Sequence, residues 1–241
     1  ATTWSVVAGG GVIDGGGLFT AGTALGTYTN TIKATSGTMT GTATVVVKLG
    51  PLATITVTPN PAELVVNGTQ QMTAVGADIG GNIVAFIPVW AVVTLSNGAS
   101  ITSTGMYTAG TVSGTFVNKI RASSGAIAGY ATTHAIAGPL ATITVTPTPV
   151  TMPTNAQQQF TAVGRDANNN LFVINPVWTV VNGGGVISAS GLFTSGGAAG
   201  SYLGTVKATS GATFGTADVN VLSPISPPAL DILGNAAPNG I

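Results

Sequence analysis

Few side chains in this sequence could perform acid–base, nucleophilic or metal chemistry. There is no cysteine, and six acidic and six basic residues are spread over 241 positions. His134 is the single histidine, and a catalytic base needs an oriented partner and a nearby nucleophile, which no neighbouring pattern supplies. Two similar stretches of the chain carry Val46 and Asn220 close to the equivalent position. We interpret His134 as a strand surface residue and predict no catalytic residue and no enzymatic activity.

Two aspartates recur in similar surroundings rich in Gly and Asn. Asp78 stands in Gly-Ala-Asp-Ile-Gly-Gly-Asn and Asp166 in Gly-Arg-Asp-Ala-Asn-Asn-Asn. Calcium takes about six to eight oxygen ligands, usually from several carboxylates. One carboxylate per turn is too few, so we predict no metal site. Asp followed by Gly and Asn instead favours an Asx turn, in which the side chain accepts hydrogen bonds from the backbone just beyond it.

Two glycine triplets and three basic residues are also candidates for ligand binding. Gly9–Gly11 and Gly183–Gly185 resemble phosphate-binding loops, but such a loop needs a following Lys-Ser/Thr pair and a helix, and neither follows here. We interpret both triplets as turns. Lys33, Arg121 and Lys207 share one position near a strand end, where a basic side chain usually lays its stem over apolar surface. We therefore predict no cofactor-binding site.

These residues belong to an internal repeat with a spacing of about 88 residues. The segment Pro-Leu-Ala-Thr-Ile-Thr-Val-Thr-Pro at 51–59 returns at 139–147, and Pro-Val-Trp at 88–90 returns at 176–178. Repeats fix the architecture because each unit is one structural module. A Gly-Leu/Met-Phe/Tyr-Thr motif starts at Gly17, Gly105 and Gly191, and the Lys/Arg-Ala-Thr/Ser-Ser-Gly motif starts at Lys33, Arg121 and Lys207.

The repeat divides the chain into modules. Residues 51–138 and 139–224 are two complete units, here called the second and third modules. Residues 1–50 match only the C-terminal half of a unit and are called the first module, and residues 225–241 form a tail outside the pattern. The first strands of the first module must then come from further chain or from another molecule, as in donor-strand complementation.

The modules are predicted to consist of strands. Several segments alternate polar and apolar residues, the period of a half-buried strand, and turn residues separate them every 8–12 positions, a rhythm typical of an all-β sandwich. No window has a helical period with caps, so we expect no α-helix. The clearest predicted strands are 42–47, 54–58, 71–75 and 159–163.

Three tryptophans occupy one repeat position, and short joints connect the units. An immunoglobulin-like sandwich buries an aromatic side chain on a central strand, so we predict that Trp4, Trp90 and Trp178 fill the space between sheets. The joints are marked by Gly50-Pro51 and Gly138-Pro139, with almost no residues left for linkers. We therefore predict all-β, tandem immunoglobulin-like β-sandwiches arranged as a rod.

The combination of motifs resembles the group 2 bacterial immunoglobulin-like domain. The resemblance covers residues 1–224 and implies an extracellular structural or adhesive role with no catalytic motif. A shorter stretch, residues 229–241, resembles the start of an ice-binding-like domain of secreted microbial proteins. The motifs that carry the main resemblance are Ala-Thr-Ile-Thr-Val-Thr-Pro, the Gln-rich second strand, Val-Trp-x-Val, Gly-Val-Ile-Ser-x-x-Gly-Leu-Phe-Thr and Lys-Ala-Thr-Ser-Gly.

Composition indicates which partners the surface suits. Only 5% of residues are charged and the formal net charge is zero, against about 25% charged residues in ordinary domains. Nothing therefore favours nucleic acid or an anionic membrane, and no apolar run is long enough to insert into a membrane. A surface made polar by Thr, Ser and Asn, with net charge near zero, favours association.

These features together predict a secreted, non-enzymatic structural protein of the cell surface. We expect a homo-oligomer, filament, sheath or array held by uncharged Thr-rich surfaces and by the 225–241 tail. An adhesin or stalk that presents a separate domain to a receptor, glycan or ice is the alternative. Thr-x-Thr arrays can also bind ice, but the same alternation is expected of any half-exposed strand, because Thr favours strands.

Overall fold

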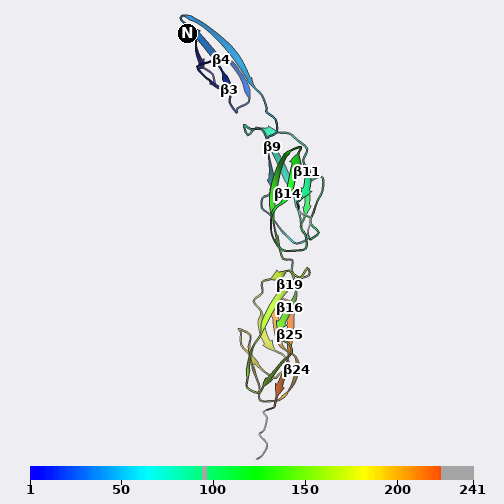
Figure 1. Ribbon diagram of the computed structural model, residues 1–241. Coiled ribbons are helices and arrows are strands. Elements are labelled where there is room, and N and C mark those ends of the chain that lie inside the picture. The colour runs from blue at the N-terminus through cyan, green and yellow to red at the C-terminus, as the bar shows by residue number, and fades with distance from the viewer. Residues whose placement is uncertain (94–96, 224–241) are drawn as a thin grey trace, which may run out of the picture. The chain divides into compact units, whose positions relative to one another are not determined.

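The computed structural model describes residues 1–93 and 97–223, and the predicted tail at 225–241 lies outside these described residues. Every regular element in them is a β-strand, so the chain is an all-β protein of tandem β-sandwich modules, as predicted (Figure 1). No helix that could cross a membrane occurs in this part of the chain. The chain forms two compact units, Ala1–Ala137 and Gly138–Ile241. No sheet joins strands from both sides of residues 50 and 51, but the predicted boundary there stays a prediction.

The second module is a complete sandwich. One sheet has the order β10-β9-β6 and the opposite sheet the order β11-β14-β15-β7, while β12-β13-β8 closes one end. Only the pairing of β7 with β15 is parallel. Its strands are β6 (Thr54–Thr58), β7 (Ala62–Val65), β8 (Thr69–Gln71), β9 (Thr73–Ala77), β10 (Ile83–Val84), β11 (Val89–Val92), β12 (Ser100–Ile101), β13 (Met106–Thr108), β14 (Gly114–Ser124) and β15 (Ile127–Ile136).

The third module repeats this topology. Its sheets have the orders β16-β19-β20, β17-β25-β24-β21 and β18-β23-β22, and β17 again pairs in parallel with β25. The same sequence pattern therefore produces the same fold twice. The strands are β16 (Leu140–Thr146), β17 (Val150–Pro153), β18 (Gln157–Gln159), β19 (Thr161–Asp166), β20 (Leu171–Phe172), β21 (Val177–Val180), β22 (Gly185–Ile187), β23 (Leu192–Ser195), β24 (Gly200–Ser210) and β25 (Thr213–Leu222).

The Gln-rich strand predicted at 71–75 and at 159–163 is in fact two strands in different sheets. The breaks fall at Met72 and Phe160, which are 1% exposed, and the Met72 N–H donates to the carbonyl of Gly105, just beyond the end of β8. β8 pairs with β13, whereas β9 pairs with β6 and β10. The period-2 pattern survives the break because the inward-pointing positions stay in phase, so the sequence did not reveal it.

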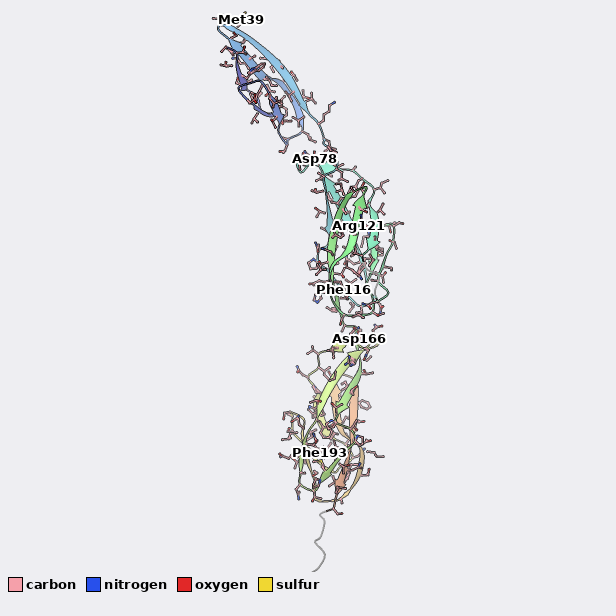
Figure 2. All side chains as sticks on the ribbon, in the orientation of Figure 1. Met39, Asp78, Phe116, Arg121, Asp166 and Phe193 are labelled. Atoms are coloured by element: carbon pink, nitrogen blue, oxygen red, sulfur yellow. The ribbon has the colours of Figure 1, made fainter. Side chains whose placement is uncertain are left out.

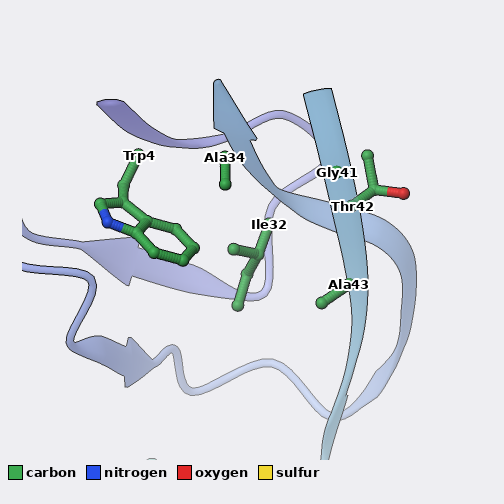
Figure 3. A pocket seen from close by; sticks show the side chains of 6 residues that line it. All are labelled: Trp4, Ile32, Ala34, Gly41, Thr42 and Ala43. Atoms are coloured by element: carbon green, nitrogen blue, oxygen red, sulfur yellow. The ribbon is translucent and has the colours of Figure 1, made fainter. Parts of the chain in front are cut away.

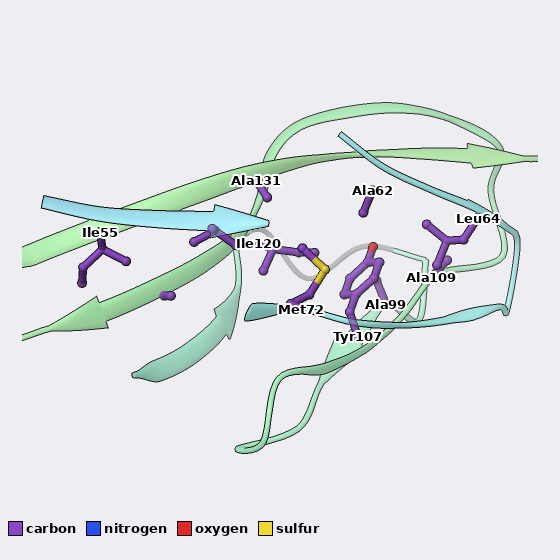
Figure 4. Close-up of a cluster of buried hydrophobic side chains, with 11 residues drawn as sticks. Ile55, Ala62, Leu64, Met72, Ala99, Tyr107, Ala109, Ile120 and Ala131 are labelled. Carbon is purple, nitrogen blue, oxygen red and sulfur yellow. The ribbon is translucent and has the colours of Figure 1, made fainter. Parts of the chain in front are cut away.

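Aromatic side chains other than tryptophan fill the centre of each core. Tyr107, which directly follows the repeated Gly-Met/Leu pair, is 1% exposed and lies in the core of the second module (Figure 4). Phe193, at the same repeat position of the third module, is 0% exposed. Phe193 meets Phe160 edge-on, with ring centroids 6.0 Å apart. The predicted central role of the tryptophans is therefore wrong: Trp90 and Trp178 are only partly buried and pack at the margin of the cores.

Trp90 and Trp178 each pack against a glycine of the neighbouring hairpin. A Cβ added to Gly105 would lie 3.0 Å from Cε2 of Trp90, and one added to Gly191 would lie 3.0 Å from Cε2 of Trp178. Both glycines also have positive φ, at 86° and 83°, a conformation that only glycine adopts readily. The repeated glycine therefore serves the turn and the indole ring together.

The first module contains a smaller set of strands. β1 (Thr3–Val6), β4 (Gly26–Ser36) and β5 (Met39–Val47) form one sheet in the order β1-β4-β5, and β2 (Gly11–Ile13) pairs with β3 (Phe19–Ala21). These strands correspond to β11 to β15 of the second module. No described strand of this module corresponds to β6, β7 or β9.

Candidate functional site

The loop that follows β9 is organised by the carboxylate of Asp78 (Figure 2). Oδ1 accepts hydrogen bonds from the backbone N–H groups of Gly80, at 2.9 Å, and Asn82, at 2.8 Å. Oδ2 accepts from the Asn82 side-chain amide and from the N–H of Gly50, both at 3.0 Å. The carboxylate thus forms the predicted turn and also accepts a hydrogen bond from the backbone immediately before its own module.

The corresponding loop after β19 has the same arrangement. Asp166 Oδ1 accepts from the N–H groups of Asn168 and Asn170 at 2.9 and 2.8 Å. Its Oδ2 accepts from the Asn170 side chain and from the N–H of Gly138, both at 2.8 Å. Sequence reasoning found the turn but missed the bonds to Gly50 and Gly138, whose one signal is a shared separation of 28 residues from the aspartate.

Asp78 and Asp166, here called the joint aspartates, both have lowered pKa values. The side-chain amide of Asn82, followed by the N–H of Gly50, lowers the pKa of Asp78 below 3.8. Burial raises the pKa of Asp166, but hydrogen bonds from Asn170 and Gly138 outweigh it and the net shift is also downward. A lowered folded-state pKa stabilises the folded form above the unfolded value, and this contribution disappears as pH falls through the folded-state pKa.

Replacing a joint aspartate should therefore have an effect that depends on pH. In Asp166→Asn one carboxylate oxygen is replaced by an NH₂ group, which cannot accept the hydrogen bonds that Gly138 and Asn170 donate. The third module should therefore melt at lower temperature than wild type at neutral pH. The difference should shrink below pH 3.8, because the wild-type carboxyl also becomes protonated. Thermal unfolding followed against pH, with hydrogen exchange at Gly138, measures this.

Asp14→Asn is the matched control for that experiment. Asp14 Oδ1 accepts from the N–H groups of Gly16 and Leu18 inside the β2–β3 hairpin, so it caps a similar turn at a distance from both joint glycines. The control should leave exchange at Gly50 and Gly138 unchanged. A difference between Asp166→Asn and wild type that persists undiminished in acid would contradict the role given to the charge.

The other candidate residues from the sequence are not brought together. His134 lies on the surface of β15 with Nδ1 3.8 Å from Oε1 of Glu63. Lys207 holds Nζ 4.2 Å from the centroid of the Phe214 ring, so its stem and charge lie over apolar surface. Within the described ranges no three His, Cys, Asp or Glu side chains form a group that could hold a metal ion.

The glycine triplets form tight turns, and a tyrosine ring packs against each of them. Gly10 and Gly184 have φ of 85° and 84°, and a Cβ on either would lie 2.6 Å from a ring carbon of Tyr28 or Tyr202. The hydroxyl of Thr205 donates to the carbonyl of Gly183. The backbone polar groups of these loops are thus used internally.

The β1-β4-β5 sheet of the first module carries an apolar depression on one face. A depression of about 240 Å³ is lined by Trp4, Ile32, Ala34, Gly41, Thr42 and Ala43 (Figure 3). Trp4 is 38% exposed, whereas the tryptophans at the same position of the complete modules are partly buried. The lining is almost entirely apolar.

A second apolar surface follows the edges of the complete modules. β10 and β20 are the outer strands of their sheets, and Ile83 and Leu171 on them are 74% and 65% exposed. Val89 and Val177, on the outer strands β11 and β21, are each 66% exposed. No charged residue occurs at 79–118 or at 167–206, so these edges are uncharged as well as apolar.

These features define a tandem β-sandwich repeat protein. No protein-family model and no curated protein matches the sequence. The surface layer protein SbsC, domains 1–6, is similar in structure, with 20% identity over 90% of this chain and a TM-score of 0.39. Mouse cadherin-23 EC22-24 has 12% identity over 92% of this chain and 86% of that chain, with a TM-score of 0.43. The chain spans 37% of the SbsC fragment's length, and similarities at this level are no evidence of function.

Proposed function

We propose that this chain is a non-enzymatic, extracellular structural protein whose modules assemble laterally into a filament, sheath or surface array. The observation that carries the proposal is the pair of uncharged, apolar outer strands repeated in the second and third modules. Sheets of monomeric proteins usually protect such edges with charged side chains, proline or bulges, because bare edges pair with other chains. Here the exposed side chains on the edges include Ile83, Leu171, Val89 and Val177, with the uncharged Thr179.

The repeated joint hydrogen bonds support the same function. Gly50 and Gly138 each donate to a buried aspartate of the module that they precede. This contact fixes the backbone that enters each module, so successive modules would start from a defined geometry.

Charge placed on the outer strands should prevent assembly. In the double variant Ile83→Lys, Leu171→Lys, lysines would occupy positions that are 74% and 65% exposed, so each module should keep its melting temperature within the small range expected of surface changes. Assembly seen for wild type by sedimentation velocity and negative-stain microscopy should need at least about tenfold more protein, because an edge-to-edge contact would bury the added charge.

The control places the same charges away from the edges. Val117→Lys with Leu203→Lys changes residues that are 73% and 68% exposed but lie in the bulges of β14 and β24, where the register with the next strand shifts. This variant should assemble like wild type. If wild type stays a monodisperse monomer at high concentration, lateral assembly is excluded, and a stalk that carries a separate binding domain becomes the better account.

A further inference from the structure

The first and second modules are joined by a side-chain hydrogen bond inside one compact unit. That unit, Ala1–Ala137, contains both modules. The side-chain amide of Asn82, in the loop between β9 and β10, donates to the backbone carbonyl oxygen of Thr23, in the segment between β3 and β4, at 2.9 Å. The two residues are 59 positions apart, so the bond connects two modules and does not belong to one turn.

The same amide also donates to the carboxylate of Asp78. Nδ2 of Asn82 lies 3.1 Å from Oδ1 and 3.0 Å from Oδ2 of Asp78. An asparagine amide carries two N–H groups, so one is shared between the carboxylate oxygens and the other is left for Thr23. The carboxylate therefore fixes the direction of the second N–H. Hydrogen bonds linked in this way polarise one another, which strengthens the bond to Thr23.

The two loops also approach each other closely beside this bond. A Cβ added to Gly80 would lie 3.1 Å from the Cβ of Thr23, so a larger side chain at position 80 would press on the first module. A separate depression of about 240 Å³ next to the bond is lined by both modules, with Thr23 and Leu25 from the first and Asp78 and Asn82 from the second. The contact is thus a shared surface as well as a single bond.

The carboxylate of Asp78 connects this contact to the chain that enters the second module. Its Oδ2 accepts from the N–H of Gly50 at 3.0 Å. One side chain therefore binds the backbone between the modules directly and, through Asn82, a loop of the first module. Two attachments that are separated along the chain restrain movement more than the covalent connection alone, because each removes conformational freedom from the joint.

We propose that Asn82 couples the second module to the first. The binding surface is the loop from Asp78 to Asn82, and its partner is the segment between β3 and β4 of the preceding module in the same chain, through the carbonyl of Thr23. The coupling restrains the movement of one module against the other. The inference does not rest on lateral assembly, because it needs no second copy of the chain.

Distances between two spin labels on the full chain test this coupling. The chain contains no cysteine, so Thr40→Cys on β5 and Val117→Cys on β14, both at exposed positions, place one label on each module. Asn82→Ala should broaden the distribution of label distances at least twofold. Asn170→Ala makes the same change in the corresponding loop of the other compact unit, so it is the matched control and should leave the distribution unchanged.

Asn82→Ser separates the coupling from the folding of the loop. A serine hydroxyl has one donor instead of two, and donation to Asp78 leaves Thr23 without a donor. The second module should therefore melt like wild type, while the distance distribution should broaden as in Asn82→Ala. The proposal is overturned if wild type is as broad as Asn82→Ala, if neither variant broadens the distribution, or if broadening occurs only when the second module has also lost its melting transition.

Discussion

Phe193→Ala should destabilise the third module by about 3–5 kcal/mol, the cost usual for removing a buried phenylalanine ring. Phe193 is 0% exposed, and its ring packs against Phe160 with an interplanar angle of 86°. The substitution removes this contact and leaves a cavity between the two sheets. Because a domain of this size has only about 5–15 kcal/mol of stability, the variant should lose a large part of it.

Calorimetry and hydrogen exchange of the full chain would measure this loss. A change of 1 kcal/mol shifts the melting temperature of a domain of about 100 residues by roughly 4 °C or more, so the third module should melt at least about 12 °C lower. Protection should fall in residues 139–223 and stay constant in the second module, which lies in the other compact unit.

The equivalent substitution in the first module is the internal control. Phe19 occupies the same repeat position but is only partly buried, so Phe19→Ala should cost much less, because less apolar surface returns to water. If both substitutions cost the same, the cores are not organised around this position in the way that the burial indicates.

Much of the fold could be predicted because its determinants are local and repeated. The alternation in Thr54–Thr58 predicted β6 with its observed bounds. The repeat also predicted two equivalent sandwiches. Local period and recurrence are sufficient here because each strand has one buried and one exposed face.

The features that escaped prediction depend on partners distant in sequence. The switch of sheets at Met72 leaves the polar–apolar alternation intact, so only tertiary packing reveals it. Trp90 packs against Gly105 of the neighbouring hairpin. The hydrogen bond from Gly50 to Asp78 joins residues 28 positions apart. In each case the residue type was noticed, but its role depends on which backbone lies beside it.

Gly129→Ala and Gly215→Ala should destabilise their modules by about 3 kcal/mol, the upper part of the range for overpacking. Each added Cβ would collide with a backbone carbonyl of the covering strand, at Ile55 or Ile143. A backbone oxygen in a paired strand cannot rotate away as a side chain can, so β6 or β16 must shift as a whole. The melting temperature of the affected module should fall by roughly 12 °C or more.

The same change at Gly41 provides the comparison that gives this prediction its meaning. Gly41→Ala adds the same methyl group at the corresponding position of the first module's hairpin. Nothing lies within 4 Å of a Cβ on Gly41. Its effect should stay within about 0.5 kcal/mol, as for surface substitutions. Equal losses of stability at Gly41 and Gly129 would mean that the backbone conformation of the hairpin alone requires glycine at this position. Unequal losses would attribute the requirement to the covering strand.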